Sequence, residues 1–150
     1  MSRVITSCQI ASVDEKIVWD IIKAIERYPD FMEHVVEVEV LHDDQGVRDS
    51  TWTVLFNGNR LRWTERAQID DDRYEVGFEQ LDGDLAAWRG KTSISRDGAA
   101  VVATFDIEFD VGVPALAELI TPLAEQAVRT NCEQMLQAIT KRVEERCNRE

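Results

Sequence analysis

Glu65 stands among aromatic residues on one face of a predicted hairpin, where a carboxylate can act as an acid or a base. Asn57-Gly58 separates two runs of alternating apolar and polar residues, and this dipeptide is typical of a two-residue turn with positive φ. Pairing outward from Phe56 and Asn59 gives an aromatic face: Val54 opposite Leu61, Trp52 opposite Trp63, and Ser50 opposite Glu65. The other face is mostly charged: Leu55 opposite Arg60, Thr53 opposite Arg62, Thr51 opposite Thr64, and Asp49 opposite Arg66. Because successive side chains alternate between faces, the aromatic face is expected to point inward.

The position of Glu65 allows two interpretations. In an apolar pocket its carboxylate loses hydration, which raises the pKa and suits the group to general acid–base catalysis. Alternatively, Glu65 reaches solvent or pairs with a cation at the cavity mouth, since structural ion pairs also perturb acids. Ser50 is a candidate hydrogen-bond donor to Glu65 in either case.

The same alternation predicts the wall of a cavity between the sheet and a helix. The expected inward residues of the strands are Trp52, Val54, Trp63, Glu65, Ala67, Tyr74, Val76, Phe78, Trp88, Thr92, Phe105 and Ile107. Leu123, Asn131 and Met135 face them from the helix, and Tyr28 and Phe31 stand at the entrance. These aromatic residues either fill the core or line a cavity. The cavity is favoured because Trp is costly to bury fully and its N–H needs a partner.

The order of elements predicts an α+β domain. Strands are expected at 4–10, 35–42, 48–56, 59–69, 73–81, 85–95 and 99–109, and the last six follow one another through short turns, which implies antiparallel pairing. A helix follows the capping-box segment 12–15, ends before Pro29 and is followed by a short second helical turn. A long amphipathic helix is expected at about 114–145, bent or broken at Pro122. Only this helix can cover the apolar face of a curved seven-stranded sheet.

Length and charge narrow the class of protein. The chain has 150 residues and a net charge of −12, which predicts a single domain spanning 1–150. The charge opposes binding to nucleic acid or to anionic membrane surfaces, which both select clustered Lys and Arg. Because no apolar run approaches the ~20 residues of a membrane helix and the N-terminus has no signal-peptide pattern, we expect a cytoplasmic protein. We expect it to be a monomer or a homodimer.

The residues that usually hold metals form no recognisable site. Cys8, Cys132 and Cys147 are scattered, without metal-ligand spacing. His34 and His42 have no nucleophile beside them in any motif, so a catalytic triad is unsupported. The acidic turns 70–72 and 82–84 are either hydrated loops or weak calcium sites. We therefore expect no metal and no cofactor.

The chain resembles the START-like SRPBCC superfamily, and most closely its polyketide cyclase/aromatase branch. The resemblance covers nearly the whole chain and rests on these segments: Val18-Trp19-Asp20, Ile25-Glu26-Arg27-Tyr28-Pro29, 36–41, Leu61-Arg62-Trp63-Thr64-Glu65-Arg66 and Arg129-Thr130-Asn131. It implies the helix-grip (START/Bet v 1-like) fold, with two short helices after the first strand. It also implies a cavity for a hydrophobic small molecule, often a poly-β-keto chain presented by an acyl carrier protein.

The chain departs from this branch at its catalytic positions. Related aromatase/cyclases carry an inward Arg where this chain has Ala67, and some use a His and an Asp that align near Ile107 and Met135. Glu65 is then the inward ionisable residue left to act in their place. One hypothesis is an enzyme that cyclises, aromatises or dehydrates a polyketide- or acyl-like substrate, as in antibiotic biosynthesis. In this hypothesis Glu65 transfers the proton, and the carbonyl groups of the substrate are bound by Ser50, Tyr28 and Asn131. The remaining ligand-binding residues are Phe31, Trp52, Trp63, Ala67, Phe78, Trp88, Thr92, Phe105, Ile107 and Met135.

Two other hypotheses remain open on the sequence. The apolar replacements favour a non-catalytic binding protein, such as a carrier, chaperone or self-resistance protein for an aromatic or quinone-like ligand. A structural or regulatory domain with a filled core has no supporting motif.

Overall fold

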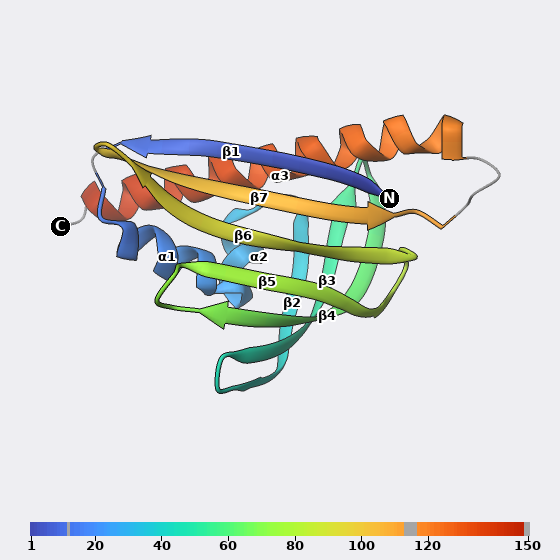
Figure 1. Ribbon diagram of the computed structural model, residues 1–150, viewed down its shortest axis with the longest axis horizontal. Coiled ribbons are helices and arrows are strands. Elements are labelled where there is room, and N and C mark those ends of the chain that lie inside the picture. The colour runs from blue at the N-terminus through green and yellow to red at the C-terminus, as the bar shows by residue number, and fades with distance from the viewer. Residues whose placement is uncertain (12, 113–116, 149–150) are drawn as a thin grey trace.

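A computed structural model describes residues 1–150 except 12, 113–116 and 149–150. The elements are β1 (Ser2–Ala11), α1 (Glu15–Lys23), the 3₁₀ turn η1 (Ile25–Arg27), α2 (Tyr28–Phe31), β2 (Val35–Asp44), β3 (Val47–Phe56), β4 (Asn59–Asp70), β5 (Glu75–Gly83), β6 (Ala87–Asp97), β7 (Ala100–Asp110) and α3 (Ala117–Asn148) (Figure 1). The predicted α+β order, with two short helices after the first strand, is confirmed.

The strands form one antiparallel sheet in the order β1-β7-β6-β5-β4-β3-β2. Its best-predicted part is the β3–β4 hairpin. Asn57 and Gly58 have φ values of 51° and 80°, as a type I′ turn requires. Trp52 pairs with Trp63 and Ser50 with Glu65, so the predicted register is confirmed.

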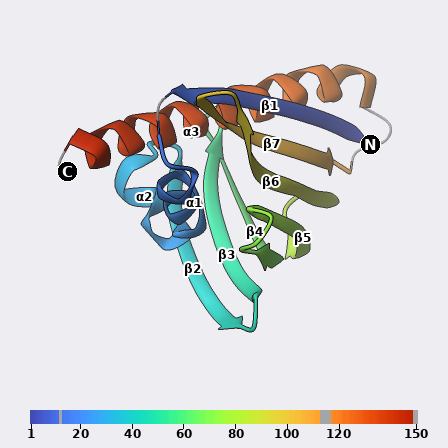
Figure 2. The same cartoon turned by 60° about the vertical axis from the view of Figure 1, so that its left-hand side comes forward.

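Helix α3 covers the concave face of the sheet. It packs along β1 and meets the end of β3 at Leu55, while the other end of the β2–β3 hairpin lies far from it (Figures 1 and 2). Its buried stripe is Val128, Asn131, Cys132, Leu136, Ile139 and Val143. Helix α1 packs against α3, so the core lies between the sheet on one side and these two helices on the other.

The start of α1 differs in detail from the capping-box prediction. Asp14 is the N-cap, and its carboxylate accepts a hydrogen bond of 2.9 Å from the Lys16 amide, as short acidic side chains do at helix starts. Ser12 lies outside the described residues. The helix ends at Lys23, and Pro29 lies in the first turn of α2, where its missing N–H costs no hydrogen bond.

Three further predictions need correction. Helix α3 continues through Pro122 without a break, because a proline near the start of a long helix removes only one of many hydrogen bonds. Leu123 is 74% exposed and does not face the sheet, since the buried stripe begins further along the helix. Tyr74 was predicted to point into the cavity, but it is not part of the cavity wall. It precedes β5 at a φ of 56°, and its ring packs on Trp19 of α1, with centroids 5.4 Å apart.

Two glycines of neighbouring strands give a matched test of how tightly the sheet is packed. A Cβ on Gly90 of β6 would clash with the Asp106 carbonyl oxygen and would lie 3.0 Å from Cζ of Phe78. A Cβ on Gly77 of β5 would meet nothing within 4 Å. We therefore expect Gly90→Ala to lower the free energy of unfolding by about 1–3 kcal/mol and Gly77→Ala to change it by less than about 0.5 kcal/mol. Urea unfolding of both variants measures this, and equal effects would contradict the packing described.

Candidate functional site

A mostly apolar cavity lies between the concave face of the sheet and the helices. Its wall consists of Ile22, Ile25, Tyr28, Arg48, Trp52, Val54, Phe56, Trp63, Glu65, Val76, Phe78, Trp88, Thr92, Phe105, Ile107, Asn131, Cys132 and Met135. The space available to the centre of a water-sized sphere is about 70 Å³.

Three indole rings, of Trp52, Trp63 and Trp88, lie in the wall. Trp52 and Trp63 are stacked across the β3–β4 ladder, with ring centroids 6.0 Å apart and planes 3° from parallel. Trp88 of β6 meets Trp63 with centroids 5.1 Å apart. The rings therefore partly fill the space that they line. The aromatic residues both contribute to the core and line a cavity, so the two interpretations of the aromatic face each apply in part.

Glu65 is buried within this aromatic wall, with only 6% of its surface exposed. Its Oε1 atom accepts a hydrogen bond of 2.7 Å from Nε1 of Trp63, two residues earlier on the same strand face. Burial raises the pKa of Glu65 from 4.5 to about 7, against the smaller lowering effects of the Trp63 hydrogen bond and the Arg48 charge. Near neutral pH the group is therefore present in both protonation states, as an acid–base catalyst requires.

A strand irregularity lies directly beside Glu65. Thr64 pairs with Asp82 of β5, but Glu65 pairs with Gln80, so Leu81 is an extra residue on the β5 side. Bulges of this kind increase the local twist and redirect neighbouring side chains, and they are frequent next to functional sites. The pattern of apolar and polar residues gave no sign of this bulge.

Arg48 is the main wall residue that the sequence analysis missed. It lies on β3 with only 5% of its surface exposed and pairs directly with Ala67. Its Nη1 atom donates a hydrogen bond of 2.7 Å to the carbonyl oxygen of Lys23, the last residue of α1. Glu65 is therefore not the only inward ionisable residue. The predicted register already contained the signal, because Arg48 has the same alternation as Ser50 and Trp52.

The structure brings together most of the predicted site residues and separates three of them. Those in the cavity wall are Tyr28, Trp52, Trp63, Glu65, Phe78, Trp88, Thr92, Phe105, Ile107, Asn131 and Met135. Ser50 and Ala67 are buried beside the cavity rather than in its wall. Phe31 lies in a separate groove beneath Arg142, whose guanidinium carbon is 5.3 Å from the ring centroid.

The polar groups expected to bind carbonyl oxygens already make hydrogen bonds within the protein. Tyr28 donates its hydroxyl hydrogen to the Ile22 carbonyl oxygen at 2.5 Å, and Asn131 Nδ2 donates to the Leu55 carbonyl oxygen at 3.3 Å. Ser50 Oγ accepts from Nε1 of Trp52 at 2.9 Å. The hydroxyl of Tyr28 therefore has no donor hydrogen left for a substrate carbonyl, whereas Asn131 keeps a second amide hydrogen and Ser50, which accepts here, keeps its hydroxyl hydrogen.

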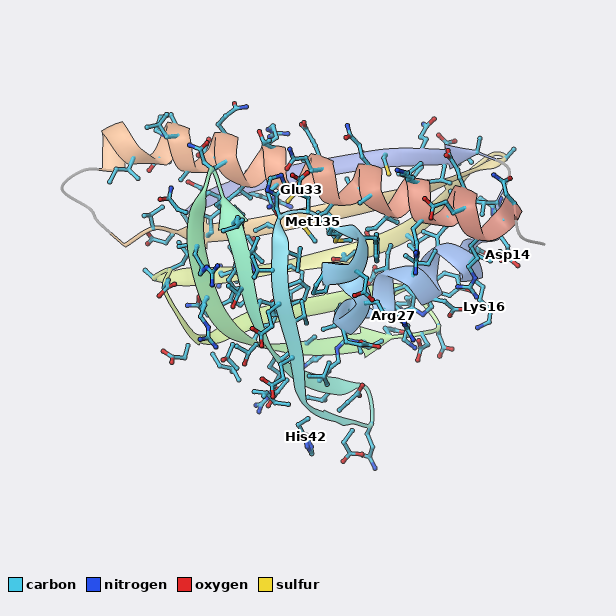
Figure 3. All side chains as sticks on the ribbon, turned by 180° about the vertical axis from the view of Figure 1, so that it is seen from behind. Asp14, Lys16, Arg27, Glu33, His42 and Met135 are labelled. Atoms are coloured by element: carbon cyan, nitrogen blue, oxygen red, sulfur yellow. The ribbon has the colours of Figure 1, made fainter. Side chains whose placement is uncertain are left out.

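The remaining candidates of the sequence analysis lie away from the cavity. His42 stands near the tip of the β2–β3 hairpin, far from α3 (Figure 3). In the acidic turn, Asp71 accepts hydrogen bonds from Trp19 and Lys23. Within the described ranges, no three His, Cys, Asp or Glu residues converge as metal ligands, and no helix has the length and apolar composition to cross a membrane.

This architecture, a curved antiparallel sheet closed by a long C-terminal helix, is the helix-grip or Bet v 1-like fold. The profile of the family described as polyketide cyclase / dehydrase and lipid transport matches residues 12–136, and the chain belongs to this family. The family resemblance and the fold expected from the sequence are thus confirmed.

Solved structures agree with this assignment at low sequence identity. The chain is similar to a protein from Thermus thermophilus (20% identity, 95% of this chain and 97% of that chain, TM-score 0.87). It is also similar to the Zhui aromatase/cyclase from Streptomyces sp. R1128 (20% identity, 97% and 95%, TM-score 0.84). A START superfamily protein from Mycobacterium smegmatis is a further neighbour (18% identity, 95% and 97%, TM-score 0.77). No curated protein sequence matches the chain significantly.

The raised pKa of Glu65 predicts a pH-dependent effect of Glu65→Gln on stability. Below pH 4.5 the carboxyl group is protonated in both folded and unfolded states. Between pH 4.5 and about 7 the unfolded chain loses this proton while the folded chain keeps it, so the free energy of unfolding falls as pH rises. Glu65→Gln removes this loss and is expected to gain about 3 kcal/mol relative to wild type between pH 4.5 and pH 8.

Urea unfolding of both proteins at the two pH values measures this gain. Other titrating groups, such as Asp49 and Asp106, are common to both proteins and cancel in the difference. Glu79→Gln makes the same change on an exposed residue of β5 and is expected to show no such gain. A constant difference between Glu65→Gln and wild type across this pH range would show that Glu65 titrates normally.

Proposed function

We propose that the protein binds a small polyketide- or acyl-like molecule in this cavity and promotes its cyclisation or dehydration by proton transfer at Glu65. The observation that carries the proposal is a carboxyl group buried among indole rings, with its pKa raised to about 7. Membership of a family that includes polyketide cyclases and dehydrases supports the same class of reaction.

The proposed chemistry needs one residue that takes up and returns a proton. Ionised Glu65 removes a proton from a carbon between two carbonyl groups, and the resulting enolate carbon attacks another carbonyl carbon of the same chain. Protonated Glu65 then returns the proton to the new alkoxide oxygen. Dehydration follows when ionised Glu65 removes the adjacent C–H proton and returns it to the hydroxyl group, which leaves as water. The aromatic walls contribute by holding the reacting carbons close together.

The size of the cavity limits the substrate. Pockets for drug-sized ligands have volumes of about 300–1,000 Å³, whereas the space here is about 70 Å³. A ligand of more than a few heavy atoms must therefore displace wall side chains. Phe78 and Met135 are the half-buried residues of the wall, so their side chains are the ones that can move aside with least loss of packing. Met135 lies on the part of α3 that faces the sheet (Figure 3).

Binding without chemistry is the second candidate, and one observation favours it. Tyr28 and Asn131 already donate hydrogen bonds to backbone carbonyl oxygens, so the tyrosine has no free hydroxyl hydrogen for a substrate carbonyl. A carrier for an apolar aromatic molecule needs only the indole wall. The two candidates differ in whether a bound ligand is converted.

A substrate panel with Glu65→Gln separates the two candidates. The panel consists of N-acetylcysteamine thioesters of short poly-β-keto acids, with the free acids beside them to test whether a thioester, as on a carrier protein, is needed. Binding is followed by quenching of tryptophan fluorescence, because Trp52, Trp63 and Trp88 line the cavity. Mass spectrometry detects cyclised products and the loss of water.

We expect wild type to convert at least one thioester and Glu65→Gln to lose about 100-fold or more of the turnover rate, with the affinity nearly unchanged. Glu79→Gln is the control for the same chemical change outside the cavity and should turn over as wild type does. Binding without conversion by wild type would select the carrier, and full turnover by Glu65→Gln would remove Glu65 from the reaction.

A further inference from the structure

The guanidinium group of Arg48 is buried in the cavity wall and incompletely paired. Nη1 donates to the Lys23 carbonyl oxygen, but Nε is buried and has no hydrogen-bond partner in the described part of the chain. Among the same residues, the ion pairs within 4.0 Å do not include Arg48. A buried cation without a partner is costly, so this donor points to a group that the free protein lacks.

The surroundings of Arg48 leave its positive charge only partly compensated. The Lys23 carbonyl belongs to the C-terminal end of α1, where the helix dipole is negative. Glu65 is a diagonal neighbour of Arg48 on the same sheet face, since Arg48 pairs with Ala67 and Ser50 with Glu65. Because burial keeps Glu65 partly protonated near neutral pH, it does not neutralise Arg48 fully. Arg48 therefore has no ion-pair partner within 4.0 Å in the described residues and lies in a mostly apolar wall.

The position of Arg48 on β3 differs from the one that the family resemblance implied. The resemblance placed an inward Arg at the position of Ala67 on β4, and the register sets Arg48 directly opposite that alanine. Ala67 is itself buried, and the guanidinium of Arg48 reaches the Lys23 carbonyl oxygen of α1. This cross-strand arrangement follows from the pairing of this chain and from no single sequence motif.

We propose that Arg48 anchors a carboxylate oxygen of the ligand, while the apolar body of the ligand lies against the indole rings. The inference rests on the proposed function in one respect: it assigns a chemical class to the ligand of that same cavity. A planar guanidinium with a free Nε–H binds such an oxygen with good geometry. The free protein leaves this hydrogen bond unmade, and the ligand completes it.

Calorimetric titration with 2-naphthoate and its neutral analogue 2-naphthamide tests this anchor. The two molecules share shape and apolar surface and differ in the charge that Arg48 would recognise. The titrations are made at pH 6, where naphthoate is ionised and Glu65 is largely protonated. We expect wild type to bind naphthoate at least tenfold more tightly than naphthamide and Arg48→Gln to lose this preference. Arg66→Gln, which removes the same charge from the exposed face of β4, should keep it.

Arg48→Lys gives a second reading if Arg48→Gln does not fold, as judged by circular dichroism, because it keeps a charge at this position. It should retain part of the preference but bind more weakly, since a lysine lacks the planar fork of donors. Equal affinity of wild type for the two probes, no binding of naphthoate, or an undiminished preference in Arg48→Gln would each overturn the anchor.

These outcomes are independent of the proton-transfer role of Glu65. Glu65→Gln should still prefer naphthoate, because its neutral amide leaves the Arg48 donor in place. If Glu65→Gln also keeps full turnover while wild type prefers naphthoate, the anchor stands and the proposed reaction fails. If the preference is absent while Glu65→Gln loses turnover, the reaction stands and the anchor fails.

Discussion

The register between β3 and β4 is the constraint on which the site depends. The Asn57-Gly58 turn has positive φ at both residues, and it sets Trp52 opposite Trp63 and Ser50 opposite Glu65. A shift by one residue would reverse the faces. It would turn the Asp49–Arg66 ion pair, now exposed on the outer face with a distance of 2.9 Å, into the apolar cavity. The cost of burying these charges therefore holds the tryptophans and Glu65 inside.

Two opposing effects within the cavity determine the pKa of Glu65. Burial favours the neutral form of Glu65, while the indole N–H of Trp63 and the charge of Arg48 favour the ionised form. Burial is the larger effect, so the pKa of Glu65 is raised, but the opposing groups limit the rise to a value of about 7. Cys132 in the same wall experiences the same desolvation, which raises the pKa of its thiol to about 12 against smaller lowering effects. Cys132 therefore stays protonated and behaves as an apolar wall residue.

Much of the fold was predictable from the sequence because its signals are local. Turn residues mark each strand connection, alternation marks the faces, and an amphipathic stripe marks α3. The errors arose where tertiary packing overrides the local pattern. Tyr74 continues the alternation of β5, yet its ring packs on Trp19, and Leu123 continues the helical stripe beyond the part of α3 that the sheet covers.

The site was predictable only in part. The register identified the wall of tryptophans and Glu65, but it did not reveal that Phe31 packs beneath Arg142 or that the hydroxyl of Tyr28 binds the Ile22 carbonyl. These contacts join segments that are placed by the packing of α1, α2 and α3, which no short sequence pattern encodes. Arg48 was present in the predicted register, yet an arginine in an alternating strand normally indicates the exposed face. Its burial becomes visible only with the Lys23 carbonyl beside it.

The buried position of Glu65 holds its pKa near 7, and the titration of this carboxyl group can be observed directly. Carbon-detected NMR of protein labelled at the glutamate side-chain carboxyl carbon follows every glutamate with pH, and the signal lost in Glu65→Gln assigns this residue. The burial of Glu65 predicts a midpoint near pH 7, well above that of solvent-exposed glutamates. A midpoint near 4.5 would show a hydrated carboxylate and contradict the account.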